Sequence, residues 1–260
     1  MIKLVCCLLI LTGIFNKKED LQDFTASTTK VVLAGDNLLI DLIIKDAVEQ
    51  NWKLSPYEFC TIEQYEKIKT DTTYYFLKRV NDEAVEFLTL SKGGEDDSYI
   101  ISLPLSACGD SGDRIFTYIP AYLTMIQNHI SKIIDRRLNA YIGMNMYSLG
   151  FNEAKGKKMY LHKDDVEEDI DFDSMYDEGV VGVIGDDELD RLLERRPKNT
   201  IVSLTVAPTN VPAARNLSYV YRMLIDVENS ELMYYSKQRM NRRNGRKFQE
   251  GDMKRLSISF

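Results

Sequence analysis

The residues with the clearest capacity for chemistry begin at position 162. His162 precedes Asp164 by two residues, and an acidic run continues from there to Asp173. A histidine oriented by carboxylates can act as a general acid or base. One hypothesis is therefore a hydrolase that uses His162 with the acidic residues around it. The sequence identifies no third catalytic group, so we assign no residue a catalytic role.

The acidic run also contains a weak metal-binding pattern. Asp169, Asp171 and Asp173 have the spacing that opens a calcium loop, but Ser174 stands where such a loop needs glycine and Val180 where it needs glutamate. We therefore expect a solvated acidic loop and assign no metal site. The chain also lacks the glycine-rich motifs that cradle nucleotide phosphates, so no cofactor is assigned.

A serine-containing loop, Gly109-Asp110-Ser111-Gly112, resembles the nucleophile loop of trypsin-like serine proteases. That family needs a general-base histidine before the serine, and the only two histidines, His129 and His162, both follow it. We expect an ordinary loop here. At an apolar position of a helical pattern, His129 is expected to be a hydrogen-bonded core residue.

Basic residues are concentrated near the carboxyl terminus. From this segment we select four as candidates for binding an anionic partner: Arg242, Arg243, Arg246 and Lys247. The partner could be a protein or cell-envelope surface, or the acidic insertion of the same or another molecule, which would give self-association. The alternative is a solvated tail. The net charge of −7 and the single interleaved aromatic, Phe248, argue against nucleic-acid binding.

The elements that must position these residues form a repeat in outline. In each half, a long amphipathic helix (38–51, then 120–137) precedes a short strand, a short acidic-headed helix and three strands. We predict an α/β fold of two similar β-α-β-α-β-β-β-like units, 30–107 and 115–240, packed as a tandem duplication about a pseudo-two-fold axis. The second unit carries an insertion at 138–180. A basic tail at 241–260 ends in a predicted edge strand.

The amino terminus has the features of an export signal. Lys3 precedes an uncharged apolar run, Leu4 to Phe15, within a signal-like segment at 1–22. The run is too short for a transmembrane helix, which needs about 20 residues. The alternatives are a buried strand and a cytoplasmic α/β binding protein. Cys60 and Cys108 could form a disulfide or remain as two buried thiols.

Two resemblances bear on function. The order of elements, together with the hairpin of residues 221–234, resembles the amino-terminal domain of TolB and the periplasmic domain of the curli-secretion lipoprotein. Residues 31–59, 84–94 and 125–129 look like a group of uncharacterised exported Bacteroidota proteins. These resemblances imply export and a non-enzymatic role as a binding or envelope-assembly component.

Overall fold

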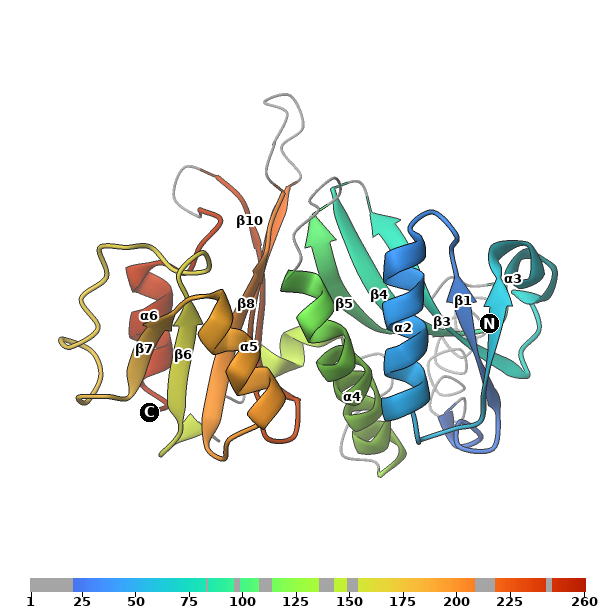
Figure 1. Ribbon diagram of the computed structural model, residues 1–260, viewed down its shortest axis with the longest axis horizontal. Coiled ribbons are helices and arrows are strands. Elements are labelled where there is room, and N and C mark those ends of the chain that lie inside the picture. The colour runs from blue at the N-terminus through green and yellow to red at the C-terminus, as the bar shows by residue number, and fades with distance from the viewer. Residues whose placement is uncertain are drawn as a thin grey trace, which may run out of the picture. The chain divides into compact units, whose positions relative to one another are not determined.

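The computed structural model describes residues 21–82, 84–95, 99–107, 114–135, 143–148, 154–208, 218–241 and 245–260 (Figure 1). Within these residues the protein has a mixed α/β fold with two five-stranded sheets, which confirms the predicted fold class. The chain divides into two compact units. Unit 1 contains residues 1–79, 89–102 and 126–143, and unit 2 contains residues 80–88, 103–125 and 144–260.

The first sheet has the order β2-β1-β3-β4-β5, and β1 pairs in parallel with both β2 and β3. Its elements are β1 (Thr28–Leu33), α2 (Leu38–Asn51), β2 (Tyr57–Thr61), α3 (Ile62–Ile68), β3 (Tyr74–Asp82), β4 (Val85–Lys92) and β5 (Tyr99–Ala107). The second sheet has the order β10-β9-β8-β6-β7, and β6 pairs in parallel with both β7 and β8. Its elements are β6 (Lys158–His162), β7 (Val181–Ile184), α5 (Asp186–Arg195), β8 (Thr200–Val206), β9 (Tyr219–Asp226) and β10 (Glu231–Arg239).

The two sheets share one connectivity. When β6, β7, β8, β9 and β10 are matched in turn with β1, β2, β3, β4 and β5, the spatial order of the strands is the same. In both sheets the first strand is parallel to its two neighbours, and a helix (α3 or α5) joins the second strand to the third. This agreement supports the prediction of two similar units and is consistent with a duplication.

The long helices, however, are not counterparts. α2 joins β1 to β2, whereas the helix α4 (Arg114–Ile134) precedes β6 and the short 3₁₀ helix η2 (Met144–Ser148). The predicted strand matches are unchanged, but the counterpart of β1 is β6, which lies inside the segment that we expected to be an insertion. The counterpart of α2 is the chain between β6 and β7, residues 163–180, which contains no helix.

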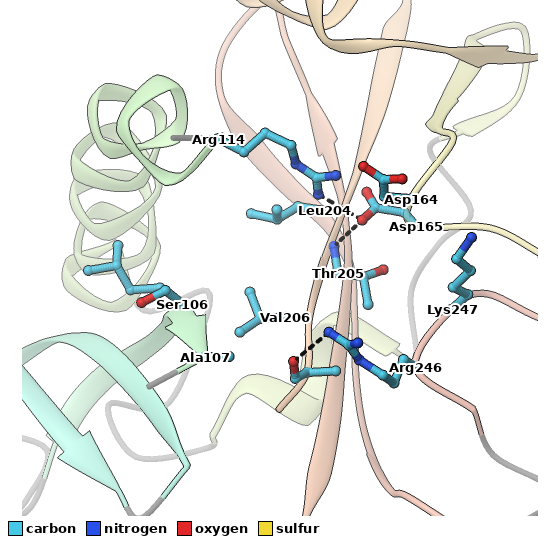
Figure 2. Close-up of a pocket in the computed structure, with 12 residues that line it drawn as sticks. Ser106, Ala107, Arg114, Asp164, Asp165, Leu204, Thr205, Val206, Arg246 and Lys247 are labelled. Atoms are coloured by element: carbon cyan, nitrogen blue, oxygen red, sulfur yellow. Dashed lines mark hydrogen bonds and ion pairs between the residues drawn. The ribbon is translucent and has the colours of Figure 1, made fainter. Parts of the chain in front are cut away.

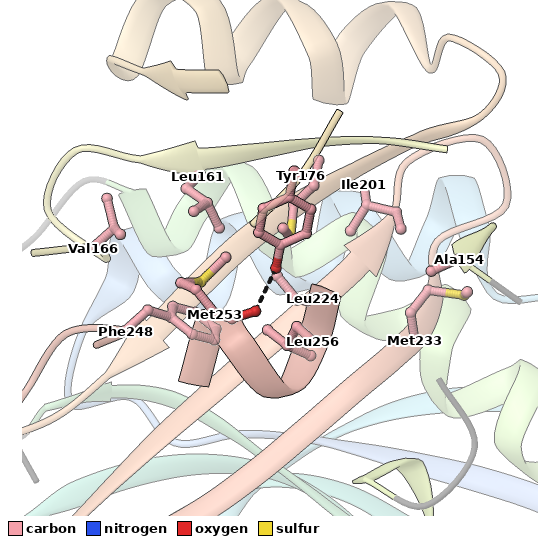
Figure 3. Packing of buried hydrophobic residues seen from close by; sticks show 11 residues of the cluster. Ala154, Leu161, Val166, Tyr176, Ile201, Leu224, Met233, Phe248, Met253 and Leu256 are labelled. Carbon is pink, nitrogen blue, oxygen red and sulfur yellow. Dashed lines mark hydrogen bonds between the residues drawn. The ribbon is translucent and has the colours of Figure 1, made fainter. Parts of the chain in front are cut away.

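The hydrophobic core of the second sheet includes the carboxyl-terminal helix α6 (Glu250–Ser257). Met253 and Leu256 of this helix pack with Leu161 of β6 and Leu224 of β9, and the hydroxyl of Tyr176 donates to the carbonyl oxygen of Met253 at 2.7 Å (Figure 3). The predicted edge strand at 256–260 is therefore wrong. Apolar residues three positions apart face the core on a helix, and the Asp252 carboxylate caps its start by accepting from the Gln249 amide at 3.0 Å.

The structure tests the prediction for one of the two cysteines that could form a disulfide. Cys60 is a free, buried thiol that packs with Val32, Tyr65 and Phe76, and burial raises its pKa. Cys108, the loop 109–112 and residues 1–20 lie outside the described residues. No helix in the described part of the chain is long and apolar enough to cross a membrane.

His129 of α4 is a core residue, as expected. Its side chain is only 1% exposed, and burial is the main reason that its pKa falls to about 4, although a hydrogen bond with the backbone of Ile100 acts in the opposite direction. The imidazole is therefore neutral in the folded protein at neutral pH.

We predict that acidification destabilises the fold partly through His129. An unfolded histidine titrates near pH 6.5, so the unfolded state takes up this proton first and stability is lost as the pH falls towards 4. Between pH 7 and pH 5 the loss is about 2 kcal/mol. Urea unfolding of wild type and His129→Gln at both pH values measures it. An equal loss in the two proteins would contradict the prediction.

Candidate functional site

A cavity of about 480 Å³ lies beside the carboxyl end of β8, and all the residues that line it belong to unit 2. The pairing register places Tyr160 of β6 opposite Val202 of β8. β6 ends at His162, but β8 continues to Val206. The last residues of β8 therefore pair with β9 on one side but have no strand on the side that β6 has left. The cavity occupies this edge (Figure 2).

A buried carboxylate, Asp165, organises this strand end. Only 2% of its side chain is exposed. One carboxylate oxygen accepts from Arg114 at 2.7 Å and from the Thr205 amide at 3.1 Å, and the other accepts from the Ser203 hydroxyl at 2.7 Å. The Asp165 backbone oxygen also accepts from the Phe248 amide at 2.6 Å. One residue thus joins β6, β8, α4 and the carboxyl-terminal tail.

The position of Arg114 depends on the start of α4. This helix begins six residues before Pro120, earlier than the sequence suggested. The hydroxyl of Tyr118 donates to the Ser203 carbonyl oxygen at 2.8 Å, and that of Tyr122 donates to the Pro104 carbonyl oxygen at 2.6 Å. These two bonds fix the first turns of α4 in unit 2. Burial alone would lower the pKa of Arg114, but the neighbouring Asp165 carboxylate raises it.

His162 is completely buried beside this pair. Its Nδ1 lies 2.6 Å from Nη1 of Arg114, and because a guanidinium only donates, Nδ1 must be the unprotonated acceptor. The proton therefore sits on Nε2, which lies 3.1 Å from Oδ1 of Asp186 without the alignment of a hydrogen bond. Burial and the Arg114 charge lower the pKa of His162, so the ring is neutral at neutral pH.

The basic tail reaches the cavity because Arg222 of β9 holds it there. The Arg222 side chain is fully buried and donates to the carbonyl oxygens of Gly245 at 2.8 Å and Lys247 at 2.7 Å. A parallel bridge between Val166 and Phe248 ties the tail to the chain that follows β6. These contacts place the neighbouring residues Arg246 and Lys247 at the cavity wall.

The equivalent strand end of the first sheet also holds an aspartate and an arginine. There the Asp41 carboxylate accepts from the amides of Ala34 at 3.3 Å and Gly35 at 2.7 Å, just beyond β1. Arg79 of β3 pairs with Asp36 and lies 3.5 Å from Asp41. Both sheets therefore place an acid–arginine pair near the end of their first strand, as Asp41–Arg79 and as Asp165–Arg114.

Only some of the candidate residues chosen from the sequence lie at the cavity. Arg246 and Lys247 line the cavity, whereas Arg242 and Arg243 lie outside the described residues. Three other candidates, Asp169, Asp171 and Asp173, are exposed on the segment between β6 and β7. Apolar residues between and beside them pack against the core and send the carboxylates outward. Among the described residues there is no group of three or more acidic, histidine or cysteine side chains able to hold a metal ion.

Sequence reasoning missed the residues that build the site. Asp165 was one carboxylate within an acidic run, and Arg114 and Arg222 stood in segments with no chemical motif. A signal did exist for Arg222, because a charged residue within the apolar strand pattern of β9 must find buried partners. The partners of the Asp165 carboxylate lie 38 to 51 residues away along the chain and left no local pattern.

We predict that Asp165 and its neighbour Asp164 differ sharply in their effect on stability. Asp165→Asn leaves the partly buried Arg114 charge without its counter-ion, which should cost about 2–4 kcal/mol of unfolding free energy. Asp164→Asn is the matched control, because that side chain is 66% exposed and its change should stay within about 0.5 kcal/mol. Urea unfolding at pH 7 measures both. Equal effects of the two substitutions would refute the role of Asp165.

Comparison with known proteins found no similar protein. No protein-family model matches the chain, and neither curated proteins nor solved structures include a match. The resemblance to the TolB and curli-secretion domains stays a prediction. The site is therefore interpreted from its own residues and their geometry.

Proposed function

We propose that the protein is a non-enzymatic binding component whose second sheet holds a small molecule in the cavity beside β8. The observation that supports this most directly is the position of the cavity at the carboxyl ends of β6 and β8. A volume of about 480 Å³ falls within the range of small-molecule sites, which is roughly 300–1,000 Å³.

The strand order of the second sheet explains why a ligand would bind at this position. From β6 the chain passes to β7 on one side, and from β7 it crosses to β8 on the other side of β6. Neighbouring parallel strands whose connections leave in opposite directions form a crevice at their carboxyl ends, where open α/β sheets bind ligands. The cavity occupies this crevice in unit 2. In the first sheet, Asp41 and Arg79 lie near the corresponding strand end.

Binding is favoured over hydrolysis by the state of His162. A general base must reach the proton that it removes. The ring of His162 is fully buried, its Nδ1 accepts from Arg114, and it is not among the residues that line the cavity. These contacts suit a residue that positions Arg114 rather than one that reacts with a substrate.

A hydrolase stays the second candidate because carboxylates do surround His162. Oδ1 of Asp186 lies 3.1 Å from Nε2, and Oδ2 of Asp164 lies 3.6 Å from Nδ1. Burial would raise the pKa of Asp186, but His162 and Lys163 together lower it, so this carboxylate is ionised beside the ring at neutral pH. If the His162 ring moved towards the cavity, His162 and Asp186 could act there as a histidine–carboxylate pair.

The cellular setting belongs to the same proposal. The apolar run from Leu4 to Phe15 supports export, with a protein or envelope surface as partner and the cytoplasm as the alternative location. Export predicts that protein recovered from its native cells lacks this run. Amino-terminal sequencing reads the first residue directly, and an intact Met1 or Ile2 would contradict export.

We predict that blocking the cavity abolishes ligand retention. Ser106 lines the cavity and is only partly buried, so an indole in Ser106→Trp should fill the space without disrupting β5. The protein is incubated with a small-molecule extract of its native cells and passed over a gel-filtration column, and retained molecules are identified by mass spectrometry. Wild type and the control Ser174→Trp, an exposed site, should retain the same molecule. The proposal fails if wild type retains nothing, or if Ser106→Trp retains as much.

The hydrolase alternative predicts turnover that depends on His162. His162→Asn preserves an acceptor for Arg114 but removes the ionisable ring. Release of nitrophenol from nitrophenyl acetate and nitrophenyl phosphate is followed for wild type and this variant. We expect no difference between the two proteins. Turnover by wild type that falls at least a hundredfold in His162→Asn would instead establish the hydrolase.

A further inference from the structure

The cavity beside β8 has a basic wall formed by Arg246 and Lys247. Arg246 donates to the Ala207 carbonyl oxygen at 3.2 Å, and Lys247 donates to the Lys163 carbonyl oxygen at 3.3 Å. Within the described residues neither cation forms an ion pair with a carboxylate. Asp165, a buried acid that also lines the cavity, is already paired with Arg114. The two tail cations therefore retain their capacity to bind an anion.

An unsatisfied hydroxyl lies beside these cations. The Oγ1 atom of Thr205 is buried and has no hydrogen-bond partner in the part of the chain that the structure describes. Figure 2 shows Thr205 between Asp165 and Arg246 at the edge of β8. A buried hydroxyl without a partner costs free energy, so a ligand oxygen that accepts from it would be favoured.

The opposite wall of the cavity is apolar. It is formed by Leu105 and Ala107 of β5 and by Leu204 and Val206 of β8. These side chains can bind a ligand only by burying its apolar surface, and they offer no hydrogen bond to a sugar or a peptide. The cavity thus combines an apolar surface with one concentrated cationic end.

We propose that the ligand is an organic anion with an apolar body and a single carboxylate or phosphate group. Its oxyanion lies between Arg246 and Lys247 and accepts from Thr205, and its body lies against Leu204 and Val206. This inference rests on the proposed function, because it names the class of molecule that the cavity holds. Asp164, at the same wall, sets a limit: with it the lining charge is three cations against two carboxylates, which suits one anionic group and not several.

A matched series of probes tests the charge and the body separately. 2-Naphthoate and 2-naphthyl phosphate carry the same ring with different oxyanions, naphthalen-2-ylmethanol carries the ring without charge, and inorganic phosphate carries charge without the ring. Isothermal titration calorimetry measures each against the full chain. We expect at least one of the two anionic naphthalenes to bind tenfold or more tightly than the alcohol and than inorganic phosphate, and their order identifies the preferred oxyanion.

Paired variants then locate the binding. Arg246→Gln/Lys247→Gln should weaken the tighter anionic probe at least tenfold, because charge-assisted hydrogen bonds are lost. Arg195→Gln/Lys198→Gln removes the same charge from exposed positions outside the cavity and should change the affinity less than twofold. Thr205→Val, which has nearly the same shape, should weaken binding about threefold to tenfold. Melting temperatures within a few degrees of wild type show that the variants remain folded.

The outcomes separate this inference from the proposed function. If the alcohol binds as tightly as the anions, or if the Arg246/Lys247 variant binds them as wild type does, the ligand class is wrong although the cavity binds. Failure of all four probes together with retention of a cellular molecule blocked by Ser106→Trp also overturns the class alone. Failure of the probes and of retention overturns both.

Discussion

The buried pairing of Asp165 with Arg114 is the constraint on which the candidate site depends. A carboxylate with 2% exposure is tolerated only when its hydrogen bonds are satisfied, and here a guanidinium, a hydroxyl and a backbone amide do so. These three donors come from α4 and β8. Satisfying one charge therefore fixes where α4 begins and how β8 ends, and both Arg114 and the end of β8 line the cavity.

The duplicated topology explains why this constraint lies at a strand end. Each sheet reverses its strand order between its first and third strands, so each has a crevice at the same place. In the first sheet the Asp41 carboxylate accepts from the amides of Ala34 and Gly35 at this place. In the second sheet the helix equivalent to α2 is missing, and its carboxylate is supplied by the chain after β6. The space left beside β8 is bounded by the tail.

The sequence predicted the features that depend on neighbouring residues, and it missed those that depend on residues far apart in the chain. Strands, short helices and the repeat were predictable because hydrophobic period and caps are local features. The capping box of α3, with Thr61 and Gln64 three residues apart, is an example. The prediction of an edge strand at 256–260 was wrong, because Met253 and Leu256 pack into the core as residues of a helix. Arg246 and Lys247 were chosen from charge alone, but their place in the cavity depends on the buried Arg222, whose contacts are remote in sequence.

Amide hydrogen exchange tests most directly whether Asp165 holds the cavity together. The exchange of wild type is compared with that of Asp165→Asn at pH 7 by mass spectrometry of peptides. Loss of the carboxylate should speed exchange jointly in residues 203–207 of β8 and residues 245–249 of the tail, while peptides of β1 and β2 keep their wild-type protection. Unchanged exchange in these two segments, or an increase spread evenly over both sheets, would contradict the account.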